Sequence, residues 1–190
     1  MDVVLATSNA GKVGEASAIL EGTALRVVTV PMWLGEVETG TTYLENARLK
    51  ASAALRMLRR PVLAEDAGIE VDALHGRPGV RSARFAGPAA TSAQNNAKLL
   101  RLLAGASRRT ARYRAVAVLL LPSGEEHVGE GVLEGSVAHG PRGSGGFGYD
   151  PLFVPEGETR TMAELTAEEK NAISHRGRAL RDLLTRTAGR

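Results

Sequence analysis

The stretch Thr7-Ser8-Asn9-Ala10-Gly11-Lys12 constrains this chain most, because it joins a predicted buried strand to a predicted helix. Val3 to Ala6 is a short apolar run rich in β-branched residues, and Val13 to Leu20 carries apolar residues at helical spacing. A helix N-terminus presents unpaired backbone N–H groups and the positive end of the helix dipole. The turn therefore suits a phosphate group, which the Asn9 amide and the Lys12 charge would also contact.

The same turn is not a Walker A loop. That pattern needs a glycine five residues before its Gly-Lys pair, and Ala6 stands there. An ordinary capped helix with a surface lysine explains the turn equally well. The turn alone leaves both interpretations open.

The composition predicts one domain covering residues 1–190, with room for two lobes, since the chain is 43% hydrophobic. No apolar run approaches the ~18 residues of a membrane span, and the N-terminus lacks the features of a signal peptide. The absence of cysteine excludes thiolate chemistry and agrees with a cytoplasmic location. A net charge of +3 is too small to predict nucleic-acid binding without a clustered patch.

Segments with strand patterns and segments with helix patterns both occur along the chain. Sequences of the capping-box type at Thr42, Thr91 and Thr166 begin three predicted helices. In the first of these, Glu45, Asn46 and Lys50 lie off the apolar stripe and are expected to face solvent. Strands are expected at residues 25–30, 61–64, 69–74, 113–121, 125–137 and 152–154. The glycines of the fifth strand, among them Gly129, Gly131 and Gly135, suggest a bent or bulged strand.

Glu65 and Asp66 follow directly after the predicted strand 61–64. Acids are depleted from strands and costly to bury unpaired. One interpretation is a strand end that reaches solvent. We favour the other, a metal ligand or general base at the carboxyl edge of a sheet, where ligand sites of α/β proteins gather.

The segment from Gly143 to Pro151 is rich in glycine and contains Phe147 and Tyr149 in a chain with only 4% aromatic residues. It is either a flexible loop or a frame that leaves the flat ring of Phe147 accessible for stacking on a base.

Six stretches together match one known family, in order and over the whole length. They are Leu5 to Lys12, Glu45 to Ala47, Glu65 to Gly68, Pro78 to Gly87, Gly146 to Pro151 and Glu169 to Arg176. The chain thereby resembles the inosine/xanthosine triphosphate pyrophosphatases. The resemblance implies an α/β fold with an elongated mixed β-sheet flanked by helices, and two lobes with the active cleft between them. It also implies Mg²⁺-dependent hydrolysis of ITP, dITP and XTP to the monophosphate and pyrophosphate, and a homodimer.

The resemblance also implies roles for the matched positions. Asp66 would bind Mg²⁺ and act as general base, with Glu38 as second acidic ligand of the metal, and Ala67 would lie at the substrate. The phosphates would be held by Thr7, Ser8, Asn9, Ala10, Gly11 and Lys12. The nucleoside would be contacted by Phe147, Gly148, Tyr149 and Asp150, and the purine would be recognised by Lys170, His175 and Arg176.

The chain departs from the family pattern at three positions. Ser8 stands where glycine is common, and Ala67 replaces a serine, so that a hydroxyl at the substrate is missing. Val37 replaces one of two adjacent acids. The last change affects the second metal ligand more than the reaction itself.

Two other functions remain open at this point. A related pyrophosphatase would act on modified pyrimidine nucleotides, although the donors of His175 and Arg176 match the O6 and N7 acceptors of a 6-oxopurine better. A non-catalytic nucleotide- or RNA-binding protein is the other alternative. It would not need carboxylates near phosphate, which repel it unless a metal ion lies between them.

Overall fold

The computed structural model describes residues 1–29 and 38–188. The chain divides into two compact units. The first comprises Met1–Asp66, Ala115–Gly131 and His175–Arg190, and the second comprises Ala67–Arg114 and Val132–Ser174. Residues 30–37, which include Val37, lie outside the described residues.

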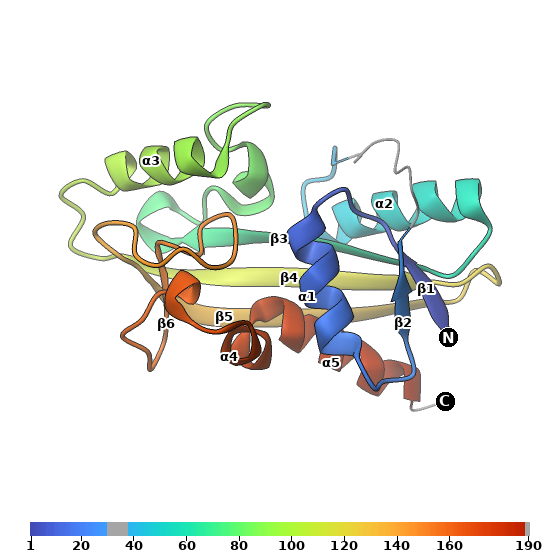
Figure 1. The fold of residues 1–190 in the computed structure, drawn as a ribbon. Helices are drawn as coiled ribbons and strands as arrows, with labels where there is room; N and C mark the ends of the chain where they lie inside the picture. The colour runs from blue at the N-terminus through green and yellow to red at the C-terminus, as the bar shows by residue number, and fades with distance from the viewer. Residues whose placement is uncertain (30–37, 189–190) are drawn as a thin grey trace. The chain divides into compact units, whose positions relative to one another are not determined.

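The described strands form a single mixed sheet with the order β2-β1-β3-β4-β5-β6 (Figure 1). Their bounds are Asp2–Leu5 for β1, Arg26–Val28 for β2, Val62–Val71 for β3, Thr110–Leu120 for β4, Glu126–Val137 for β5 and Phe153–Pro155 for β6. β1 pairs in parallel with β2 and β3, whereas β5 and β6 pair antiparallel. The predicted α/β class with a mixed sheet is confirmed.

Five α-helices are described: α1 (Ala10–Leu20), α2 (Tyr43–Leu58), α3 (Ser92–Leu102), α4 (Ala167–Ile173) and α5 (His175–Ala188). Short 3₁₀ helices span Asp72–Leu74, Gly79–Arg84 and Met162–Glu164. The three predicted capping boxes are confirmed, since Thr42, Thr91 and Thr166 each cap a helix reciprocally with the residue three positions later.

Each unit has its own core. In the first, small residues of α2 pack against β3 and β4, and α1 packs against β2 and α5. The fully buried members of that α2 cluster are Ala6, Ala47, Ala51, Ala54, Val62, Ala64 and Val118. The second core contains larger side chains, with the rings of Tyr113 and Phe153 only 4.3 Å apart between centroids. The alanines let α2 approach the sheet closely.

The two strands predicted at residues 61–64 and 69–74 are one continuous strand, β3. Glu65 and Asp66 therefore lie inside a strand, and the prediction that they follow a strand end was wrong. β1 pairs with β3 only as far as Leu63, beside Leu5. The acids thus occupy the part of β3 that continues past the end of β1, where the turn from Thr7 begins.

The glycines of β5 provide close packing. A Cβ at Gly131 would collide with the carbonyl oxygen of His175, and one at Gly129 would collide with the carbonyl oxygen of Ala179. A Cβ at Gly135 would collide with Val154. β5 is continuous over Glu126–Val137. These glycines therefore let α5 and β6 approach the strand backbone, which is a different reason for glycine than the predicted bend.

Candidate active site

The turn between β1 and α1 is a capped helix N-terminus, as the sequence predicts. Asn9 is the N-cap residue, and its side chain accepts a hydrogen bond of 3.2 Å from the backbone N of Lys12. The backbone N of Asn9 in turn donates to Oγ1 of Thr7 at 3.1 Å. Ala10 and Gly11 open the helix, so their N–H groups have no intrahelical partner. This exposed turn is organised to receive an anion.

Asp66 is the shared partner in a group of polar side chains in the first unit, which also contains Asn46, Lys50 and Glu38. Its side chain is buried, with Asn46 donating to Oδ2 at 3.0 Å and Lys50 donating to Oδ1 at 3.4 Å. The ammonium of Lys50 also donates to Oε1 of Glu38 at 2.9 Å. One cation thus joins the two carboxylates that the sequence analysis named as metal ligands.

The pKa of Asp66 is raised above its ordinary value. Burial is the main cause, the charge of Lys50 opposes it, and the nearby carboxylate of Glu38 adds to the rise. A carboxylate with a raised pKa binds a proton more readily than an exposed aspartate does. This suits a group that accepts a proton from water.

Asn46 and Lys50 were expected on a solvated helix face, and that expectation was wrong. Asn46 is 0% exposed and Lys50 is 2% exposed. Both lie on the face of α2 that is directed at Asp66, one helical turn apart. The available signal was Asp66 itself, because an acid buried in a strand needs donors from another element.

Glu65, the other acid of the pair, binds Arg176. Nε of Arg176 donates to Oε2 at 2.6 Å and Nη2 donates to Oε1 at 2.9 Å, while Nη1 donates to Glu15 of α1. Burial alone would raise the pKa of Glu65, but the charges of Arg176 and Lys12 outweigh it and bring the pKa to about 2. Glu65 is therefore ionised and serves as the structural partner of Arg176. Its pKa is lowered, whereas the pKa of Asp66 is raised.

Lys12 shares this electrostatic environment. Burial lowers the pKa of its ammonium, and the carboxylate of Glu65 partly offsets that effect. His175, the first residue of α5, is buried, and its charge also acts on Glu65. The phosphate-facing turn, both acids and the start of α5 therefore meet within the first unit.

The predicted nucleoside contacts gather in the second unit around Asp150. This side chain is buried and accepts three hydrogen bonds from three segments of the chain. The donors are the hydroxyl of Tyr113 at 3.1 Å, the backbone N of Phe147 at 2.8 Å and the ammonium of Lys170 at 2.5 Å. Asp150 thus orders the turn that carries Phe147.

Phe147 has the cation of Lys170 on its face. The ammonium lies 4.8 Å from the ring centroid. A Cβ at Gly146 would collide with Asp150 and crowd the ammonium of Lys170, and φ of Gly146 is +67°. Glycine is therefore required there. Of the two interpretations of this segment, these contacts favour a defined turn around Phe147 over a flexible loop.

The remaining predicted residues of this unit frame that turn. The hydroxyl of Tyr149 donates to the carbonyl oxygen of Ser82 at 2.8 Å, and burial raises its pKa. Gly148 has φ +64°, and its carbonyl accepts a hydrogen bond of 3.1 Å from Asn96. Ala67, just after Asp66 in β3, is partly exposed. Tyr113 and Asn96 are functional neighbours that the sequence analysis did not name.

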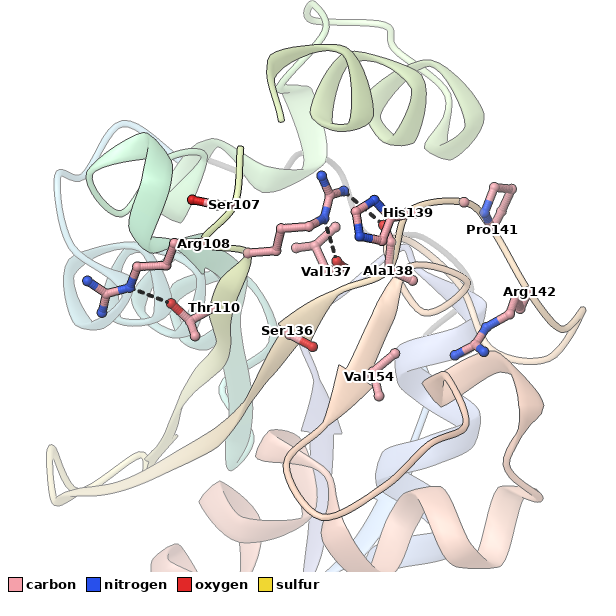
Figure 2. A pocket seen from close by; sticks show the side chains of 12 residues that line it. Ser107, Arg108, Thr110, Ser136, Val137, Ala138, His139, Pro141, Arg142 and Val154 are labelled. Carbon is pink, nitrogen blue, oxygen red and sulfur yellow. Dashed lines mark hydrogen bonds between the residues drawn. The ribbon is translucent and has the colours of Figure 1, made fainter. Parts of the chain in front are cut away.

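A hollow of about 930 Å³ elsewhere in the second unit contains none of the predicted site residues. Figure 2 shows it between the start of β4, the end of β5 and the loop that follows. Arg109 lines this hollow, and its guanidinium donates to the carbonyl oxygens of Leu103, Val137 and Ala138 at 2.8–2.9 Å. Arg109 thereby fastens two chain segments, which is a structural task.

Known proteins are similar to this chain in sequence and in fold. Residues 3–186 match the model of the Ham1 family. A dITP/XTP pyrophosphatase from Deinococcus deserti is 51% identical over 94% of this chain and 85% of its own. One from Geobacillus kaustophilus is 49% identical over 96% of this chain and 92% of its own.

Among solved structures, a HAM1 protein from Coxiella burnetii superposes with a TM-score of 0.86 at 39% identity, covering 100% of both chains. The match thus extends over sequence and fold alike. The chain belongs to the Ham1 family.

Proposed function

We propose that this chain is a dITP/XTP pyrophosphatase, which hydrolyses ITP, dITP and XTP to the nucleoside monophosphate and pyrophosphate. The observation that carries the proposal is the buried Asp66, held by Asn46 and Lys50 in the same unit as the phosphate-facing turn. Relatives of about half-identical sequence are dITP/XTP pyrophosphatases. Hydrolysis of such nucleotides removes them from the pool used for nucleic-acid synthesis.

We propose Mg²⁺ as the cofactor, with Asp66 and Glu38 as its protein ligands. Both carboxylates bind the same ammonium, so they lie close together. Within the described residues no group of three or more His, Cys, Asp or Glu side chains is arranged to hold a metal ion. Mg²⁺ needs no such group, since it is commonly held by one or two carboxylates together with substrate phosphates and water. The donor set therefore fits Mg²⁺, which when bound would offset the charge of the triphosphate.

The chain's own residues then have separate tasks. The N–H groups at the start of α1 and the ammonium of Lys12 bind the phosphates, where charge also develops during the reaction. Asp66 orients the attacking water and accepts its proton, which its raised pKa favours. No covalent intermediate is required for this reaction.

Base recognition is assigned, on the family resemblance, to Phe147 with its neighbours in sequence and to three cationic or imidazole side chains. The ring of Phe147 stacks on the base, while Tyr149, Gly148 and Asp150 shape the turn that presents it. Lys170, His175 and Arg176 donate to the purine. Because Lys170 and Arg176 have only donors, they match an oxygen at C6 and oppose the amino group of adenine.

The experiment is a panel of nucleoside triphosphates with Mg²⁺, in which pyrophosphate and orthophosphate are measured separately. We expect pyrophosphate from ITP, dITP and XTP and little from ATP. Release from modified pyrimidine nucleotides alone would favour the related pyrophosphatase. No release from any nucleotide, with binding retained, would favour a non-catalytic nucleotide- or RNA-binding protein.

The remaining predictions concern assembly and location. We propose a homodimer, on the family resemblance, and light scattering of the purified protein tests it. A cytoplasmic location and the absence of nucleic-acid partners stay predictions, as do the cleft between two lobes and the single domain. Across residues 1–29 and 38–188, none of the helices has the length and apolar character that crossing a membrane requires.

A further inference from the structure

Two helices of this chain, α2 and α3, begin with the same arrangement of a capping box followed by an asparagine. α2 starts with the capping box of Thr42 and Glu45, and α3 starts with the capping box of Thr91 and Gln94. In each case the next residue is a buried asparagine. Asn46 is 0% exposed and Asn95 is 4% exposed.

Both asparagines tie the preceding segment to the helix. Oδ1 of Asn46 accepts a hydrogen bond of 2.8 Å from the backbone N of Gly40, and Oδ1 of Asn95 accepts one of 2.7 Å from the backbone N of Ala86. The amide nitrogens have different partners. Nδ2 of Asn95 donates to the backbone carbonyl of Ala83 at 2.9 Å, so both of its bonds tether a loop.

Nδ2 of Asn46 donates instead to the Asp66 carboxylate, at 3.0 Å from Oδ2. Its orientation is unambiguous, because an N–H donor faces one side of the amide and a carboxylate acceptor faces the other. Lys50, four residues later, donates to the second oxygen of Asp66 at 3.4 Å and to Glu38 at 2.9 Å. α2 therefore fixes both oxygens of Asp66.

We propose that Asn46 is a positioning residue for hydrolysis. It holds the Asp66 carboxylate in one orientation and, through Gly40, ties it to the segment that carries Glu38. The inference rests on the proposed function. An amide is required at position 46, because an aspartate there would keep the bond from Gly40 but set a like charge against Asp66.

Asn95 provides a matched control within the same chain. N46A and N95A each remove a buried asparagine directly after a capping box, together with its two hydrogen bonds. N46A loses one backbone tether and the bond to Asp66, whereas N95A loses two backbone tethers. We expect both variants to lose a similar amount of thermal stability, about 2–8 °C in Tm. Only N46A should lose turnover, by about 10- to 100-fold in kcat for ITP, the usual loss when the partner of a functional carboxylate is removed.

The KM for ITP should stay within about threefold in N46A, because the phosphates are bound by the turn from Thr7 to Lys12. Binding of an α,β-methylene analogue of ITP, measured by calorimetry with Mg²⁺, gives a readout without turnover and should change equally little. N46D keeps the size of the side chain and should lose kcat at least as far as N46A.

The outcomes are distinct. Wild-type protein that releases no pyrophosphate from ITP would overturn the proposed function and this inference with it. If the wild-type protein is active, either of two results would overturn the positioning role alone. One is an equal kcat in N46A and N95A, and the other is a wild-type kcat in N46D. A loss of kcat confined to N46A and N46D, with analogue binding retained, would support it.

Discussion

The guanidinium of Arg176 and the carboxylate of Glu65 form a doubly hydrogen-bonded pair, 2.6 and 2.9 Å between heavy atoms, although 111 residues separate them in the sequence. Both side chains are buried. Arg176 also donates to Glu15 of α1. One arginine therefore connects α1, β3 and the start of α5.

This pair predicts how stability depends on pH. The pKa of Glu65 is about 2 in the folded protein, against an ordinary value of 4.5. The ionised Glu65 therefore contributes its full stabilisation at any pH above its ordinary pKa. This contribution to the free energy of unfolding, on the order of 3 kcal/mol, is lost as the pH falls from about 4.5 to about 2. Thermal denaturation of wild type and E65Q between pH 7 and pH 3 measures it. The difference in Tm should narrow in acid, and a constant difference would contradict the assignment.

The pair also changes how Arg176 should be tested. R176A would leave the buried carboxylate of Glu65 and the partly buried carboxylate of Glu15 without their cation, at a cost of about 3–5 kcal/mol in stability. We therefore expect a marked loss of Tm in addition to any effect on base recognition. The melting temperature must accompany the kinetics, and unchanged stability would show that Arg176 is less important to the fold than its contacts indicate.

Asp66→Asn should nearly abolish turnover while the protein remains folded. Asparagine keeps the shape of the side chain but loses the negative charge that the proposed function requires to hold Mg²⁺ and to accept the proton of water. Pyrophosphate release at saturating Mg²⁺ and circular dichroism check the two parts separately. Wild-type turnover in a folded variant would remove Asp66 from the mechanism.

Lys12→Ala should raise the KM for triphosphate and also lower kcat. Lys12 belongs to the first turn of α1. In the proposed function its ammonium stabilises both bound phosphate and the charge that develops on it. Losing one charge-assisted contact costs roughly 1.5–3 kcal/mol in kcat/KM. Steady-state kinetics with ITP measure both constants. Unchanged values would reduce Lys12 to a surface charge.

Selectivity should favour ITP and XTP over ATP by at least about 100-fold in kcat/KM, the scale on which unmatched buried polar groups discriminate. Lys170 presents donors only, so adenine would set its amino group against them. K170M keeps much of the side-chain volume and removes the charge beside Asp150 and Phe147. We expect its preference for ITP to fall at least tenfold. If K170M keeps the full preference for ITP over ATP, residues other than Lys170 discriminate between the two bases.

Local signals in the sequence predicted most of the elements. The capping boxes at Thr42, Thr91 and Thr166 fixed three helix starts, because the reciprocal bonds involve residues only three positions apart. The strand-turn-helix unit around Lys12 was also predictable from periodicity. These features depend on neighbours in sequence, which the sequence displays directly.

The partners of the acids were not predictable in this way. Helical periodicity places polar residues such as Asn46 and Lys50 in solvent, unless something polar lies buried beneath them. Asp66 is that partner, but it lies on β3, 20 residues after Asn46. Likewise nothing local distinguishes Glu15, which meets Arg176 across 161 positions. Such pairings belong to the tertiary fold.

The candidate site also depends on Gly131, a residue without a side chain, because this glycine leaves room for the start of α5. α5 begins with His175 and Arg176, and the carbonyl oxygen of His175 lies where the Cβ of any other residue 131 would be. A single methyl group there would displace the first turn of α5 and, with it, the side chains assigned to the purine. In a mutational scan scored by substrate choice, position 131 should therefore rank beside the polar residues of the site, although glycine has no side chain with which to contact a nucleotide.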